Sequence, residues 1–289
     1  MTQTATTPDP AASGPGTEAD LALKAKHRMM WASGDYPRVA TELISEFGPR
    51  LVEACGIGPG DRLLDVAAGS GNVALPAAAA GATVVASDLT PELFDSGRKA
   101  AAERGLELEW READAEALPF DDDAFDTVVS AVGVMFAPHH QPAADELVRV
   151  CRPGGTIGLI NWTPGGFVGQ MFAAMKPMAP PPPPGAQPPP LWGDEEHVRG
   201  LLGDRVDNVS TERRVVRVDA FARPEEFREF FKACYGPTIA AYEFNASDPD
   251  KVAALDEALA EVGRRFDIGD DGASVTEWEY LLLTCRAAS

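Results

Sequence analysis

Few residues in this chain are of the kinds that build disulfides or zinc centres. Only four of its 289 residues are cysteine, and they stand singly at positions 55, 151, 234 and 285. The four histidines, at 27, 139, 140 and 197, do not combine with them at zinc-ligand spacing. We therefore expect a reduced, cytoplasmic protein without structural disulfides or structural zinc.

Positive charge and long apolar runs are also scarce. The chain has 25 basic against 45 acidic residues, a formal charge of −20, which disfavours nucleic acids and anionic membranes as partners. The longest weakly polar run, 73–86, contains Pro76 and Gly81 and is too short to span a bilayer. Residues 1–20 lack the basic and apolar regions of a secretory signal and predict a disordered tail.

Strand and helix signals alternate regularly through the middle of the chain. Short apolar runs predict strands, and the segments between them have helical periodicity and helix-capping residues. The predicted strands are 62–67, 83–87, 106–111, 125–132 and 156–162, and the predicted helices between them are 72–80, 91–104 and 142–151. This alternation with short loops favours a parallel sheet with helices on both faces.

The regions on either side of this core have other patterns. Residues 21–56 predict an N-terminal helical cap with helices at 21–31 and 37–55, and residues 57–162 predict the core. Residues 163–289 contain a proline-rich loop at 180–190, an amphipathic helical insertion and further strands at 209–218 and 275–285. We interpret the whole as one domain in which the helical segments cover the edge of the sheet.

The most informative motif follows the first predicted strand. Asp65 ends an apolar run, and Gly69 and Gly71 lie in a small-residue loop that leads into a helix. Such a loop lets the backbone approach a ligand, and the helix start favours an anionic group. Asp88, at the end of the second strand, is placed to accept ribose hydroxyls. With Ala74 the loop also fits the dinucleotide fingerprint, so an NAD-dependent oxidoreductase stays open at this point.

Three later stretches distinguish between cofactors that contain adenosine. Residues 114–120 read DAEALPF after the third strand, Phe125-Asp126 opens the fourth, and residues 146–155 read ELVRVCRPGG before the fifth. In this order and spacing the chain resembles the class I S-adenosylmethionine-dependent methyltransferases, most closely the broad type 11 group related to ubiquinone and menaquinone biosynthesis. The resemblance covers about residues 30–162. It implies a Rossmann-like, doubly wound α/β fold: a mainly parallel seven-stranded sheet whose last strand is antiparallel.

The resemblance also implies a cofactor and residue roles. The cofactor is S-adenosyl-L-methionine, with S-adenosyl-L-homocysteine as product. Asp65, Ala67, Gly69 and Gly71 are implied to hold the methionine end of the cofactor. Asp88 is implied to bind the ribose, and Leu89, Asp114 and Ala115 are implied to contact the adenine. Ser130 is implied to lie beside the sulfonium. The family often has glycine where Ala67 stands. Tyr36 is placed to bond the cofactor carboxylate. The competing interpretations are a surface acid for Asp114 and a packing aromatic for Tyr36.

Candidate bases for the reaction are few. His139 and His140 follow the fourth strand, at the rim where such sheets bind ligands, and either is a candidate general base. The alternative is a polar loop before a helix. We expect no metal, because Asp121–Asp123 fits a solvated turn.

The methyl acceptor is expected to be a small molecule. Lid helices would enclose it, with Tyr36, Phe230 and Tyr235 as candidate walls. The sequence leaves open O-, N- or C-methylation and the oligomeric state. A non-catalytic protein that binds an adenosyl ligand is a further alternative.

Overall fold

A computed structural model of the chain describes residues 16–183, 185–270 and 273–289. Most of the predicted tail, residues 1–15, and Pro184 of the proline-rich loop lie outside this range. The end of that tail, Glu18 to Asp20, begins the first helix. In the described ranges, no helix combines the length and apolar character needed to cross a membrane.

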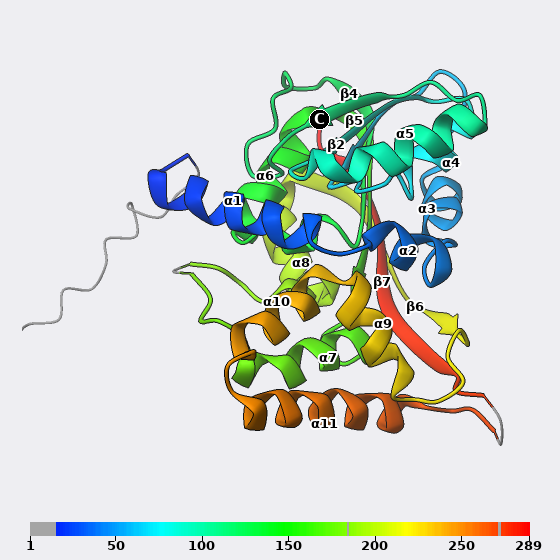
Figure 1. Cartoon of the computed structure of the whole chain (residues 1–289). Helices are drawn as coiled ribbons and strands as arrows, with labels where there is room; N and C mark the ends of the chain where they lie inside the picture. The colour runs from blue at the N-terminus through cyan, green and yellow to red at the C-terminus, as the bar shows by residue number, and fades with distance from the viewer. Residues whose placement is uncertain (1–15, 184, 271–272) are drawn as a thin grey trace, which may run out of the picture.

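One seven-stranded sheet forms the centre of the molecule, in the order β3-β2-β1-β4-β5-β7-β6 (Figure 1). Strands β1 to β5 pair in parallel, and β7 runs antiparallel to its neighbours β5 and β6. The predicted fold class is therefore confirmed. The strands are β1 (Arg62–Val66), β2 (Thr83–Asp88), β3 (Glu109–Glu112), β4 (Phe125–Ala131), β5 (Cys151–Trp162), β6 (Val206–Val218) and β7 (Thr276–Ala287).

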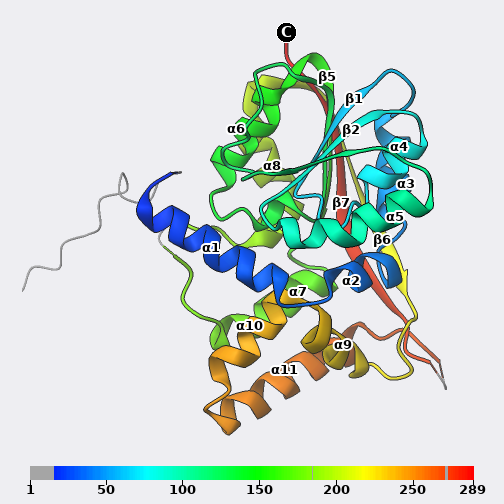
Figure 2. The ribbon, with the colours of Figure 1, turned by 45° about the horizontal axis from the view of Figure 1, so that its top comes forward.

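Helices cover both faces of this sheet (Figure 2). The central strands are apolar on both sides, so each face needs a layer of helices to exclude water. One layer is α3 (Phe47–Cys55), α4 (Ala74–Ala79) and α5 (Phe94–Glu103); the other includes α6 (His140–Val150) and α8 (Glu195–Leu202). The core is continuous between the two layers through residues such as Leu64, Val128 and Ile157.

The remaining helices gather beyond the carboxyl ends of the parallel strands. They are α1 (Glu18–Ala32), α2 (Tyr36–Glu42), α7 (Phe167–Met175), α9 (Glu226–Cys234), α10 (Gly236–Asn245) and α11 (Pro249–Phe266). Figure 1 shows α7, α9, α10 and α11 packed together where the long β7 strand starts, with α1 passing beside α10. Because β7 pairs with β5, the residues after 162 complete the same sheet as the core.

Three local predictions were wrong. The single helix expected between Pro37 and Cys55 is broken between α2 and α3, where Leu43 and Ile44 turn into the core. Strand β5 begins at Cys151, five residues earlier than expected, because a shift of register beside Phe125 accommodates the proline and glycines. Helix α7 was not predicted; it is apolar on almost every side and therefore has no amphipathic period.

Candidate functional site

A cleft opens at the carboxyl ends of the parallel strands, beneath α1. It encloses about 690 Å³ of space when its open mouth is included. Its walls come from α1, the start of α2 and the loops that follow β1, β2, β3 and β4. The lining residues are Lys24, His27, Trp31, Tyr36, Ala67, Gly69, Asp88, Leu89, Thr90, Leu93, Ala113, Asp114, Ala115, Val132, Gly133, Phe136, Ala137 and Pro138.

The loop after β1 is held by the side chain that precedes it. Oδ2 of the buried Asp65 accepts a hydrogen bond from the backbone N–H of Ala74 at 2.9 Å, which ties the loop to the start of α4. Burial raises the pKa of Asp65 to about 8. Gly71 has a φ of +86° and lies against Trp110, so a side chain there would meet the ring. Neither Asp65 nor Gly71 is among the described residues that line the cleft.

Two non-glycine residues in the cleft wall have left-handed backbone conformations. Ala67 has a φ of 55° and Val132 a φ of 47°. This region costs a residue with a Cβ about 1–2 kcal/mol. The conformation at position 67 is one that glycine adopts without strain, which accounts physically for the glycine that the resemblance leads one to expect there.

Asp88 forms the floor of the cleft. Its Oδ2 accepts from the N–H of Gly69 and its Oδ1 from the N–H of Thr90, both at 2.8 Å. Its side chain joins the ends of β1 and β2, and only 9% of the residue is exposed. Burial raises the pKa of Asp88 to about 6, although the two backbone donors oppose that shift. Leu89 follows it in the cleft wall.

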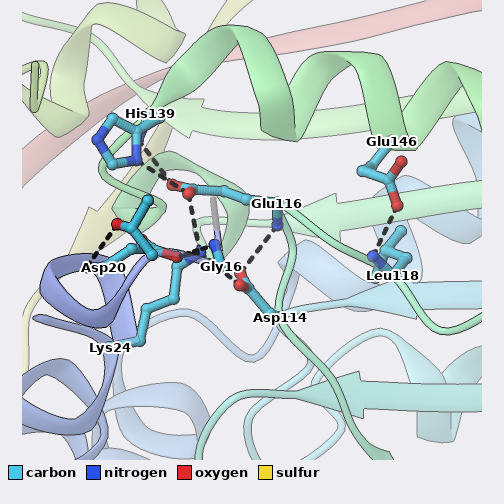
Figure 3. A network of polar contacts seen from close by, with 9 residues as sticks. Gly16, Asp20, Lys24, Asp114, Glu116, Leu118, His139 and Glu146 are labelled. Carbon is cyan, nitrogen blue, oxygen red and sulfur yellow. Dashed lines mark hydrogen bonds and ion pairs between the residues drawn. The ribbon is translucent and has the colours of Figure 1, made fainter. Parts of the chain in front are cut away.

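A buried lysine links α1 to the loop after β3 (Figure 3). Lys24 Nζ lies 3.0 Å from Asp20 Oδ2 and 3.0 Å from Glu116 Oε2, and it also contacts Asp114. Asp114 in turn accepts from the Glu116 N–H at 2.9 Å, which shapes the loop. Burial acts to lower the pKa of Lys24, but its bonds to Asp114 and Glu116 outweigh burial and raise it. This ion cluster holds α1 closed over one end of the cleft.

The same cluster has metal-ligand spacing. Ligand atoms of Asp20, Glu116 and His139 all lie within 4.8 Å of one another. Lys24 Nζ is within 3.0 Å of two of these carboxylates, so the chain supplies a cation of its own at this point. This group was not predicted, because its members are far apart along the chain.

The two candidate bases lie beside the cleft and not in its lining. His139 Nδ1 is 3.0 Å from Glu116 Oε2, and its backbone N–H donates to the same carboxylate. His140 is fully buried, with its Nδ1 2.9 Å from His197 Nε2, and burial lowers its pKa to about 3. Because neither ring is among the described residues of the cleft wall, their placement gives no support to a role as general base.

Ser130 and Tyr36 have different surroundings. Ser130 Oγ donates to the carbonyl of Val66 and accepts from the N–H of Val134, so this buried residue braces the ends of β1 and β4. Tyr36 lies over Gly69 in the cleft wall. Burial, followed by the nearby Asp88 and Asp65 carboxylates, raises the pKa of Tyr36, so its hydroxyl is neutral at pH 7.

Several cleft residues escaped the sequence analysis. Lys24 and His27 belong to a helix without a local motif, and Val132 and Phe136 lie after β4, between Ser130 and the two histidines that the sequence indicated. Burial lowers the pKa of His27, which keeps its ring neutral at pH 7. The sequence marks Lys24 only as a basic residue within the first predicted helix of an acidic chain.

Comparison with known proteins agrees with this geometry. Residues 64–159 match a family described as a methyltransferase domain. The protein Rv1405c of Mycobacterium tuberculosis is 54% identical over 267 residues, covering 92% of this chain and 96% of that protein. A demethylmenaquinone methyltransferase of Thermus thermophilus is 43% identical over 105 residues, covering 36% of this chain and 48% of that enzyme.

Solved structures extend the likeness to the whole fold. The geranyl diphosphate C-methyltransferase of Streptomyces coelicolor, solved with S-adenosyl-L-homocysteine, aligns with a TM-score of 0.51 and 19% identity. The alignment covers 84% of this chain and 76% of that enzyme. The sheet order, the loop after β1 and the matched domain agree, whereas nothing supports an oxidoreductase. Residues 64–159 are a methyltransferase domain, and the chain has the fold of the class I S-adenosylmethionine-dependent methyltransferases.

Proposed function

We propose that this enzyme methylates a small, largely apolar acceptor that is enclosed between its sheet and its lid helices. The observation that carries the proposal is the position of the cleft, whose walls include aromatic side chains from α1, α2 and the loop after β4. With a charge of −20 the chain offers no electrostatic track for a nucleic acid. A small molecule is therefore the favoured acceptor.

The residues of the cleft fit S-adenosylmethionine. Asp88 has two carboxylate oxygens with free lone pairs beside the cleft, as ribose hydroxyls require. Asp114 and Ala115 are assigned to adenine, with Leu89 packing on its ring. Gly69 and Ala67 give room for the methionine end. Tyr36 is assigned to its carboxylate. Asp65, Gly71 and Ser130 are assigned as supports of the loops that make these contacts.

The cofactor supplies an electrophilic methyl group on a sulfonium. The protein's task is to align the acceptor in line with the methyl group and to keep water out. Aromatic side chains from Trp31, Tyr36 and Phe136 provide water exclusion beside the cleft. We assign no general base to His139 or His140. The proposal involves no metal, because Lys24 provides the positive charge in the cluster with metal-ligand spacing.

The lid has two halves that interlock. A Cβ at Gly34 would overlap the carbonyl of Cys234, and a Cβ at Gly236 would overlap the carbonyl of Met30. The turn between α1 and α2 therefore packs directly against the junction of α9 and α10. Trp31 and Tyr235 add an edge-to-face contact at 5.6 Å between ring centroids. We propose that residues 21–56 and the helical part of 163–289 act together as the cover of the site.

The proposed function is tested by ligand binding and turnover. We expect S-adenosylmethionine and S-adenosylhomocysteine to bind one-to-one in isothermal titration and NAD to give no heat. With an accepted substrate, mass spectrometry should detect S-adenosylhomocysteine and a product heavier by one methylene. Folded protein that binds neither adenosyl ligand would overturn the assignment, and binding without turnover of any small-molecule acceptor would favour the non-catalytic alternative.

The affinity for S-adenosylhomocysteine is expected to depend on pH through Asp88. Ligand hydroxyls bond the charged carboxylate best, and the pKa of about 6 makes the neutral form dominant below that pH. Affinity should be nearly constant from pH 7 to 8 and fall up to about tenfold per unit below pH 6. Titration calorimetry at pH 5, 6, 7 and 8 checks this. Asp88→Asn should remove the dependence, and a slope unchanged in that variant would assign it to another group.

A further inference from the structure

A second, narrower hollow adjoins the cofactor cleft. It shares Tyr36, Val132 and Phe136 with the cleft, so the two spaces are neighbours at the end of β4 and the start of α2. Its other walls come from α2, β5, β7, α7 and the junction of α9 and α10. They are Val39, Ile44, Trp162, Val168, Phe231, Tyr235 and Trp278. Phe231 takes the place expected for Phe230, which packs instead against Phe221 and Arg38.

The chemistry of these walls restricts what can occupy the hollow. Among the described residues that line it there is no lysine, arginine, histidine, aspartate or glutamate. A phosphate, carboxylate or ammonium group would therefore be buried without a partner of opposite charge, which is strongly unfavourable. The walls favour an uncharged and largely apolar group, and their aromatic edges favour rings. As it stands the hollow has room for about one water-sized group, so a ring fits only if the walls move apart.

Tyr235 carries a polar group at the boundary of this hollow. The residue is 3% exposed, and its ring lies 6.5 Å from that of Tyr36 and 5.0 Å from that of Phe231. No hydrogen bond of its hydroxyl is found within the described part of the chain. The donor and the acceptor of this hydroxyl are therefore free within that part of the chain, and both are available to a ligand.

The other polar groups of the walls are less suitably placed. Tyr36 is shared with the cofactor cleft, where its ring lies over Gly69. The Trp278 indole N–H already donates to Thr276 Oγ1 at 2.8 Å. Trp162 is packed between Phe47 and Trp278.

The boundary residue Val132 adds an independent observation. A β-branched residue in the left-handed region is a strained outlier, and such outliers concentrate at functional sites. Val132 is 3% exposed and belongs to the walls of both spaces. The strained backbone of Val132 therefore lies at the boundary that the cleft and the hollow share.

We propose that this hollow binds the methyl acceptor as an uncharged ring system, and that the Tyr235 hydroxyl forms the hydrogen bond that selects an acceptor with a polar atom beside the reacting position. This inference rests on the proposed function and names its substrate class. Tyr235 is thus a specificity-determining residue, and acceptors with a diphosphate or phosphoethanolamine group at the reacting end are excluded. Entry of the ring requires α9 and α10 to move outward, since the aromatic walls lie close together.

The test uses three probes that share one ring system. Binding of 2-naphthol, naphthalene and naphthalene-2-sulfonate to the full chain saturated with S-adenosylhomocysteine is followed by quenching of tryptophan fluorescence. We expect 2-naphthol to bind roughly three- to tenfold more tightly than naphthalene, the value of one neutral hydrogen bond, and the sulfonate to bind least. Tyr235→Phe should abolish the preference for the hydroxyl. The matched control Tyr242→Phe removes a hydroxyl of α10 that bonds Asp256 and should preserve it.

The outcomes separate this inference from the proposed function. Failure of S-adenosylhomocysteine to bind the wild-type chain would overturn the function itself. If it binds, three results overturn the pocket alone: no binding of any probe, equal binding of the sulfonate, or an unchanged preference in Tyr235→Phe. Should that variant fail to fold, the ternary structure of the wild-type chain decides: a 2-naphthol oxygen beyond hydrogen-bond distance of Tyr235 Oη contradicts the proposal.

Discussion

Replacing Lys24 with methionine is expected to lower the free energy of unfolding by about 3–5 kcal/mol and to weaken the binding of S-adenosylhomocysteine. The side chain is 5% exposed, and its removal leaves Asp20, Asp114 and Glu116 close together without their shared cation. Uncompensated buried charges of one sign repel, so α1 should leave the loop after β3. Urea denaturation followed by circular dichroism measures the first effect, and titration calorimetry measures the second.

The control for this prediction is Lys26→Met, two residues along the same helix. Lys26 is exposed, and the substitution removes the same charge from the chain without disturbing the cluster. If α1 opens without global unfolding, the loss will be found as faster hydrogen exchange in residues 18–32. Equal stability, exchange and affinity in the two variants would show that the cluster does not hold the lid.

Asp88→Ala is expected to have the second large effect. It removes the acceptor of the Gly69 and Thr90 N–H groups, and each buried donor left unpaired costs about 1–3 kcal/mol. We therefore expect a loss of about 2–4 kcal/mol in the free energy of unfolding. We also expect a roughly ten- to hundredfold loss of affinity for S-adenosylhomocysteine, from the missing bonds to ribose. Denaturation and calorimetry measure the two losses separately.

A surface aspartate provides the matched control for Asp88. The Asp95 side chain is 86% exposed and pairs only with Arg98 at 3.3 Å, so Asp95→Asn should change neither quantity. An unchanged affinity in a stable Asp88→Ala protein would leave this carboxylate as a loop support. The two backbone bonds are the reason to expect a loss of stability as well as a loss of affinity.

The class of enzyme was predictable because its signals are local. Apolar strands that alternate with capped helices, the glycine loop after β1 and an acid at the end of β2 are each written in a few consecutive residues. Steric and hydrogen-bonding preferences of short segments decide such features. Helix α7 was missed because it is apolar on almost every side, so it has no amphipathic pattern to detect.

The sequence by itself therefore determined the sheet, the cofactor and the position of Asp88. Tertiary structure alone decided which distant residues meet. Lys24 pairs with Asp114 and Glu116 from 90 and more positions away, His139 turns to Glu116, and Tyr235 comes to lie beside Tyr36. These contacts depend on how the lid packs on the sheet. Packing is fixed by shape and burial over the whole core, which no short stretch of sequence encodes.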